Sequence, residues 1–261
     1  MTRTFSIITL SVLCLFLSAC GLFGEKTDAQ KNWTVEQYYR SAKEDLETGN
    51  YATAVKGYEA LEAKYPFGKY AQQAQLDIAY AYYLDGETAQ AASACDRFMK
   101  LHPNHPNVDY ALYLKGLAFF KPDLGLFGAL LNLDQSERDP KALRDSFEIF
   151  KDLVTRFPES IYAEDARVRM AYLINALARH DIAVARYYLN RGAYLAAVNR
   201  AQSVMQRYPQ APLNEEALVI SIVAYEKMGM ADLAADSRRV LQKNFPKNSS
   251  NLEGKPWWKL W

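Results

Sequence analysis

The stretch YPFGKYAQQA (residues 65–74) places an aromatic residue and a proline ahead of a segment rich in alanine and glutamine. Related stretches are HPNHPNVDYA (102–111), FPESIYAEDA (157–166) and YPQAPLNEEA (208–217), and a last FPK begins at residue 245. In four of these five cases a glycine lies 17 residues before the proline, within TGNYATAV, DGETAQAA, RGAYLAAV and MGMADLAA. Because the chain has only 12 glycines, this coincidence indicates a repeated unit.

The physics of glycine and proline makes this unit a pair of helices. The glycine supplies the left-handed backbone that ends a first helix, and the proline ends the second because its ring clashes with a further turn. The prolines are 37, 55, 51 and 37 residues apart: Pro66, Pro103, Pro158, Pro209 and Pro246. The unit resembles the tetratricopeptide repeat. It predicts an all-α fold, a tetratricopeptide-repeat solenoid of about five helix-turn-helix repeats.

Small residues recur where such helices approach closely. With the proline counted as position 32, position 8 holds Ala42, Ala79 and Gly116, and position 20 holds Ala54, Ala91, Ala197 and Ala234. Larger residues fill the second helices: Tyr58, Leu61, Phe98, Phe150, Leu153 and Leu241. The last repeat is a looser match, with Ile222 at position 8 and Arg238 at position 24, as expected of a terminal repeat that caps the array.

Two spacings are longer than the rest. The first excess falls in residues 121–140, where we expect an apolar loop in place of the glycine turn and a second helix that begins at Pro140. Its segment LFGALL (126–131) is either a contact loop or a cover for the core. The second excess predicts a lengthened first helix or a helix pair across 161–190, with Ala171 and Ala185 on nearly the same face.

The N-terminus has the features of a secretory signal peptide, residues 1–19. Arg3 precedes an apolar run, Phe5 to Leu17, that is too short to span a bilayer comfortably. The run ends in LSAC, which resembles the bacterial lipobox, so Cys20 is expected to carry lipid. Gly21, rather than an aspartate, follows the cysteine, and the resemblance to enterobacterial lipoprotein sorting implies transfer to the outer membrane. Removal of Arg3 leaves equal numbers of cations and anions, which gives no basic footprint for nucleic acid.

The remaining organisation follows from the repeats. We expect a lipidated cysteine and linker over 20–32, N-terminal repeats 1–3 over 33–158, C-terminal repeats 4–5 over 159–246, and an aromatic tail over 247–261. The tail ends in KPWWKLW and carries three of the four tryptophans. A segment of that composition is expected to dock on its own domain or on a partner.

The sequence offers no catalytic centre. It lacks a glycine-rich phosphate loop, a nucleophile elbow and a cysteine pair with zinc spacing. His102 and His105 are expected to be turn residues between prolines, and Cys95 a buried, inert thiol. We therefore predict no enzyme, no catalytic residue, no metal site and no cofactor.

A binding surface is predicted on the first helices of repeats 1–3. Positions 5, 9 and 12 hold aromatic residues and leucines, a composition that suits extended peptides: Tyr39, Leu46, Leu76, Tyr80, Tyr83, Tyr113, Leu117 and Phe120. The alternative, that each tyrosine only packs against a neighbouring helix, stays open.

The lipobox, YYRSAKEDLETGNYATAV, HPNHPNVDYALYLKGL, AVARYYLNRGAYLAAVNRAQSVMQRYP and PWWKLW resemble, in order and spacing, the BamD (ComL/YfiO) family of outer-membrane lipoproteins. The resemblance covers nearly the whole mature chain. It implies a non-enzymatic, lipid-anchored scaffold on the periplasmic face of the outer membrane, within the machine that assembles β-barrel proteins.

The resemblance also implies partners. The C-terminal half would dock the POTRA region of BamA, with contacts around Arg191, Tyr194, Asn199, Arg200 and Arg207. The N-terminal groove would take an extended segment of BamC or the C-terminal segment of an unfolded barrel protein, and BamE would be a further accessory lipoprotein.

Two other functional classes are alternatives. A periplasmic tetratricopeptide adaptor for cell-wall synthesis or division usually carries an N-terminal coiled coil and no lipobox. A lipid-anchored wall hydrolase needs a catalytic carboxylate in a cleft, and the sequence offers no candidate.

Overall fold

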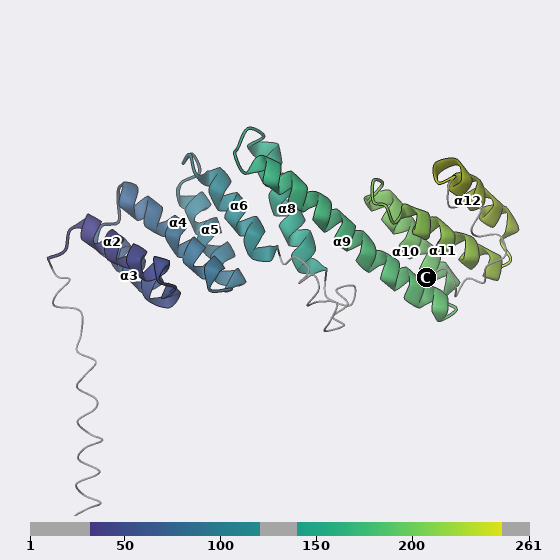
Figure 1. The fold of residues 1–261 in the computed structure, drawn as a ribbon, viewed down its shortest axis with the longest axis horizontal. Helices are drawn as coiled ribbons and strands as arrows, with labels where there is room; N and C mark the ends of the chain where they lie inside the picture. The colour runs from purple at the N-terminus through teal and green to yellow at the C-terminus, as the bar shows by residue number, and fades with distance from the viewer. Residues whose placement is uncertain (1–31, 121–139, 247–261) are drawn as a thin grey trace, which may run out of the picture. The chain divides into compact units, whose positions relative to one another are not determined.

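The computed structural model describes residues 32–120 and 140–246 (Figure 1). All regular structure in these two ranges is helical, which confirms the predicted all-α class. The predicted signal peptide, Cys20, the linker up to residue 31, the loop up to residue 139 and the tail lie outside the described residues. The chain forms two compact units, one ending at Asp77 and one beginning at Ile78. The predicted division of the repeats at residue 158 stays a prediction.

The first unit contains α2 (Val35–Glu47), α3 (Tyr51–Lys64) and the beginning of α4 (Lys69–Leu84). A capping box starts α2, because Thr34 and Gln37 each bond the other's backbone N–H. Ala42 is buried, and a Cβ added at Gly57 would lie 2.9 Å from the Cβ of Ala42. Ala42 thus lies at a close approach of the two helices of repeat 1, although the partner there is Gly57 and not one of the predicted small residues.

The second unit contains the rest of α4 and seven further helices in the described residues. These are α5 (Thr88–Leu101), α6 (Val108–Phe119), α8 (Lys141–Arg156), α9 (Ala163–Asn190), α10 (Tyr194–Arg207), α11 (Asn214–Lys227) and α12 (Ala231–Asn244). Each packs against the next along the chain from α5 to α12. This succession of helix pairs is the predicted helix-turn-helix repeat.

The predicted turn residues have the predicted conformations. The glycines before the second helices have φ between 74° and 82°: Gly49, Gly86, Gly192 and Gly229. Each second helix ends at the aromatic residue that precedes the repeat proline, with φ between −127° and −132°: Tyr65, His102, Phe157, Tyr208 and Phe245. A residue before proline disfavours the helical region, which explains why the helix ends there.

Substitution of Gly86 by alanine tests the glycine turn. Gly86 has a φ of +77°, and nothing lies within 4 Å of the position that an added Cβ would take, so only backbone strain opposes a side chain. We expect Gly86→Ala to lower the free energy of unfolding by about 1 kcal/mol in urea titrations. Gly86→Asn should cost less, because asparagine tolerates this region, and equal losses for the two variants would contradict the explanation.

The long fourth repeat is resolved as one helix, α9, of 28 residues, so the lengthened helix and not the helix pair is correct (Figure 1). Its first half packs through Leu173 in a cluster with Phe150 of α8, and its second half packs through Ala185 in a cluster with Ala197 of α10. Ala185 is buried but Ala171 is exposed. The core cluster that contains Ala185 starts at Ala178. Residues of neighbouring helices therefore cover this face of α9 only along its second half.

Candidate functional site

In the first unit, the hydroxyl of the predicted groove residue Tyr39 makes a hydrogen bond within the fold. Its hydroxyl donates to the Asp77 carboxylate at 2.7 Å, and Gln73 Nε2 donates to the same carboxylate at 2.8 Å. Leu46 is half-buried. Leu76 is only 1% exposed, which corrects its assignment to a ligand surface: it packs in the core. In this unit the predicted set therefore joins helices α2 and α4 more than it offers a surface.

Asp77 gives this network a pH dependence. Burial raises the pKa of Asp77, although the hydrogen bonds from Tyr39 and Gln73 oppose the rise. A raised folded-state pKa means that the contribution of this group to stability is complete below the unfolded value of about 3.9 and is lost as pH rises through the folded pKa.

We expect Asp77→Asn to flatten the pH dependence of stability. As pH rises above about 4, its free energy of unfolding should fall less than that of the parent chain, because the buried group no longer ionises. Glu59→Gln, at an exposed site on α3, is the matched control and should follow the parent. Parallel curves for Asp77→Asn and the parent would show that Asp77 does not carry the effect.

In the second unit, Tyr113 and Phe120 join α6 to α9. The Tyr113 hydroxyl donates to Asp165 at 2.7 Å, and its ring stacks on Tyr162 with centroids 4.8 Å apart. The guanidinium of Arg169 lies 4.7 Å from the Phe120 ring centroid. Desolvation opposes ionisation of Asp165, but hydrogen bonds from Arg169 and Tyr113 hold its pKa below the usual value. Two predicted groove residues, Tyr113 and Phe120, therefore pack against side chains at the start of α9.

Tyr80 and Tyr83 differ from the other predicted tyrosines. Their rings stack on each other with centroids 6.2 Å apart, and both are half-buried beside the small core cluster of Ala79, Cys95 and Leu114. Neither hydroxyl makes a hydrogen bond among the described residues, whereas those of Tyr39 and Tyr113 do. Among the predicted tyrosines, these two are therefore the ones whose hydroxyls remain available to a ligand.

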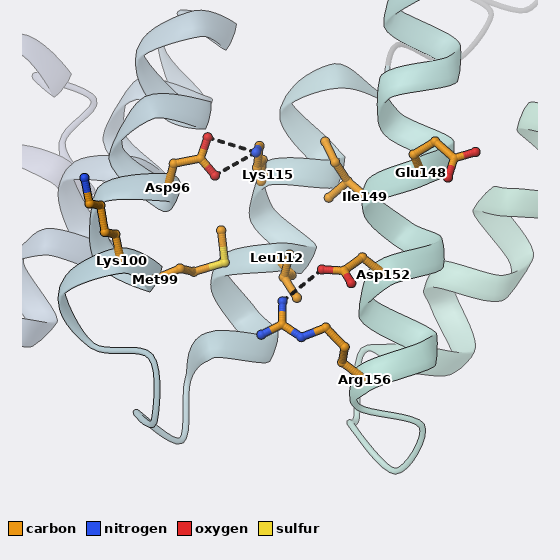
Figure 2. A pocket seen from close by; sticks show the side chains of 9 residues that line it. All are labelled: Asp96, Met99, Lys100, Leu112, Lys115, Glu148, Ile149, Asp152 and Arg156. Carbon is orange, nitrogen blue, oxygen red and sulfur yellow. Dashed lines mark hydrogen bonds and ion pairs between the residues drawn. The ribbon is translucent and has the colours of Figure 1, made fainter.

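A groove that the sequence did not indicate lies between α5, α6 and α8 (Figure 2). It is open, with a volume of about 460 Å³, and its floor is apolar: Met99, Leu112 and Ile149. Lys115 Nζ bonds both oxygens of Asp96 at 2.6 and 2.9 Å, and Arg156 Nη1 bonds Asp152 at 2.9 Å. Lys100 and Glu148 complete the lining. Its residues come from three helices with no common spacing, which is why repeat positions did not predict it.

The predicted BamA-docking residues lie at and after the end of α9. Arg191, Asn199 and Arg207 are exposed, and Tyr194 is half-buried against the core. Arg200 differs, because its Nη1 bonds Asp181 Oδ1 at 3.0 Å and the Asp181 side chain is only 1% exposed. No sequence pattern indicates this partner, which is 19 residues away on another helix. Arg200 is thus first a structural residue, with about a third of its side chain exposed.

Comparison with known proteins identifies the family. The model of the YfiO family, described as outer membrane lipoproteins, matches residues 31–241. This chain belongs to the YfiO family.

Relatives of this YfiO chain carry the name outer membrane protein assembly factor BamD. That of Neisseria meningitidis serogroup A is 48% identical over 257 residues, which are 95% of this chain and 96% of the relative. That of Neisseria gonorrhoeae is 47% identical over the same shares of both chains. That of Vibrio cholerae is 39% identical, with 80% of this chain and 86% of the relative aligned. The family resemblance inferred from the sequence motifs is confirmed.

Among the described residues of this YfiO chain, no group of three or more histidine, cysteine or acidic side chains is placed to hold a metal ion. Burial raises the pKa of the Cys95 thiol to about 12, which disfavours the reactive thiolate. No helix within 32–120 or 140–246 is long and apolar enough to cross a membrane.

Proposed function

We propose that this chain is a lipid-anchored scaffold subunit of the machinery that assembles outer membrane β-barrel proteins, at the periplasmic face of the outer membrane. The observation that carries the proposal is the 48% identity, over 95% of the chain, to a protein named outer membrane protein assembly factor. The name recurs in the Vibrio relative at 39% identity. The competing function, a cell-wall adaptor, has no such support.

The scaffold acts by binding and without catalysis. In this proposal Cys20 carries the lipid anchor, and the folded repeats hold partners near the membrane surface. Stacked helix pairs suit this role, because each added repeat extends one continuous binding surface without a separate core.

The end of α9 and the helix α10 would dock the POTRA region of BamA. Three cations support this assignment: Arg191 and Arg207 are exposed, and Arg200 keeps part of its guanidinium accessible while Asp181 fixes its position. Guanidinium groups bind carboxylates in a fixed geometry, so acidic POTRA side chains are the expected partners. Tyr194 and Asn199 would add an aromatic and an amide contact.

Tyr80 and Tyr83 would contact an extended segment, either of BamC or from the C-terminus of an unfolded barrel protein; BamE would bind as another accessory subunit. The support is the stacked ring pair, whose hydroxyls make no hydrogen bond within residues 32–120 and 140–246 and which offers apolar area and polar ends together. The double variant Tyr80→Ala/Tyr83→Ala should weaken binding of a barrel-protein C-terminal peptide about tenfold, as expected for loss of two aromatic anchors. Tyr187→Ala, at a 55% exposed site on α9, is the control.

Depletion of the chain in its own host tests the function as a whole. Folded β-barrel proteins should fall in the outer membrane while other lipoproteins stay, and the parent gene supplied in trans should restore them. Cys20→Ser should restore them poorly, because anchoring by acyl chains is then lost. Normal barrel levels together with cell-division defects would replace this proposal with the adaptor function.

A further inference from the structure

The outer side of α12 carries an apolar stripe that stays exposed. Met230, Leu233 and Val240 are 44%, 45% and 46% exposed. With Ser237 and Asn244 they fall at helical spacing along one side of α12. We define these five residues as the α12 stripe. In the described part of the chain, α12 packs chiefly against α11, which it meets through Ala234 and Leu241 on a different side.

The stripe is peculiar to the last repeat. Leu233 and Val240 are positions 19 and 26 of the repeat unit, and the other repeats hold short or polar residues there: Thr53 and Ala60, Gln90 and Arg97, Asp145 and Asp152, and Ala196 and Ser203. Met230 is position 16, where the others hold Asn50, Glu87, Ala142 and Ala193. Three large apolar residues at positions that are elsewhere short or polar indicate a covering segment at this repeat.

The two polar members of the stripe also suit a covered surface. Ser237 Oγ donates to the carbonyl of Leu233 at 2.9 Å, and Asn244 Nδ2 donates to the carbonyl of Val240 at 2.9 Å. Because both groups bond the backbone of their own helix, a segment laid over the stripe need not satisfy these donors.

The chain itself supplies a fitting segment directly after α12. Residues 247–254 are polar, KNSSNLEG, and 255–261 are KPWWKLW. Eight extended residues reach up to about 26 Å, and the stripe from Met230 to Asn244 is about 21 Å long at 1.5 Å per residue. The polar stretch is thus long enough to bring the tryptophans back to any part of the stripe.

We propose that residues 247–261 fold back on α12 and cover the α12 stripe with Trp257, Trp258 and Trp261, so that the tail caps the last repeat. The equivalent positions in repeats 1 and 2 are exposed although another repeat follows (Thr53, Ala60, Gln90 and Arg97), so covering the stripe takes a segment other than a further repeat. Tryptophan is suited to this task, since its ring buries a large apolar area while its N–H reaches solvent.

Tryptophan fluorescence tests the cap, because Trp33 is the one tryptophan outside the tail. In a Trp33→Phe chain of residues 21–261, which contains every described residue, all tryptophan emission comes from the tail. We expect this emission to be blue-shifted from that of a free 247–261 peptide and its quenching by acrylamide to be severalfold weaker. Leu233→Asp/Val240→Asp should restore peptide-like emission and quenching. Leu195→Asp, at a 63% exposed site on α10, should not.

The remaining outcomes overturn the proposal. Peptide-like emission in the Trp33→Phe chain would show that the tail is uncovered. Protection that grows with protein concentration, together with a dimer in sedimentation, would assign the stripe to a second copy. Protection that appears only on addition of phospholipid vesicles would assign the tail to the membrane. Circular dichroism confirms that each variant is folded, and both substituted side chains are exposed, so loss of folding is not expected.

Discussion

Arg200→Ala is expected to lower the free energy of unfolding by about 3 kcal/mol, the loss typical of breaking one side of a buried ion pair. The Asp181 side chain is 1% exposed, and Arg200 is its ion-pair partner. The second carboxylate oxygen of Asp181 has no hydrogen-bond partner among the described residues. Removal of Arg200 therefore leaves a buried charge without compensation. The lower end of the usual range applies because Arg200 remains 35% exposed.

A double variant distinguishes the loss of the Asp181–Arg200 ion pair from the loss of either side chain alone. Asp181→Leu/Arg200→Leu removes both charges and should be more stable than Arg200→Ala, because apolar residues replace a buried pair at little cost. Urea titration of the two single leucine variants and the double variant gives the coupling energy. If the double variant loses as much as the sum of the singles, the ion pair does not explain the effect. If the ion pair supports the fold, a substitution such as Arg200→Glu is a poor test of BamA docking. Any loss of binding could then come from lower stability.

Phe150→Ala is expected to lower the free energy of unfolding by about 3–5 kcal/mol. Its ring is fully buried among α6, α8 and α9, and it approaches α6 so closely that a Cβ at Gly116 would lie 2.5 Å from the ring. Truncation leaves a cavity that the tightly approached backbone of α6 cannot fill.

Phe67 supplies the matched control for that experiment, because it is 90% exposed. Phe67→Ala should change the free energy of unfolding by less than about 0.5 kcal/mol, the range usual for surface sites. Differential scanning calorimetry and urea titration should rank the two variants alike. A loss below about 1 kcal/mol for Phe150→Ala would show that this cluster does not hold repeat 3 to repeat 4.

The repeat architecture could be predicted because its signals are local. A glycine with positive φ and a residue before proline act through the backbone of their own turn, so Gly192 and Tyr208 could be placed from the sequence alone. Small and large residues at fixed repeat positions then located core residues such as Ala42 and Phe150. The insertion close to a whole number of turns allowed a lengthened helix or a helix pair, and the structure selects the single 28-residue α9.

The candidate binding site was less predictable because its contacts join separate helices. Tyr39 and Asp77 are 38 residues apart, and Tyr113 and Asp165 are 52 apart, across repeats of unequal length. A position that lies on the first helix can face a ligand or the next repeat, and spacing does not distinguish the two. Leu76 was assigned to the wrong side for this reason. The groove beside Met99 depends on three helices and leaves no periodic mark.

The most direct test is purification of the mature chain under mild detergent from its own outer membrane, with identification of the proteins that accompany it. The parent chain should retain a large β-barrel protein with POTRA domains, and Arg191→Glu/Arg207→Glu should retain markedly less at an unchanged melting temperature. These exposed arginines are preferred to Arg200, which supports the fold. Recovery of cell-wall enzymes without any β-barrel protein would contradict the assembly function.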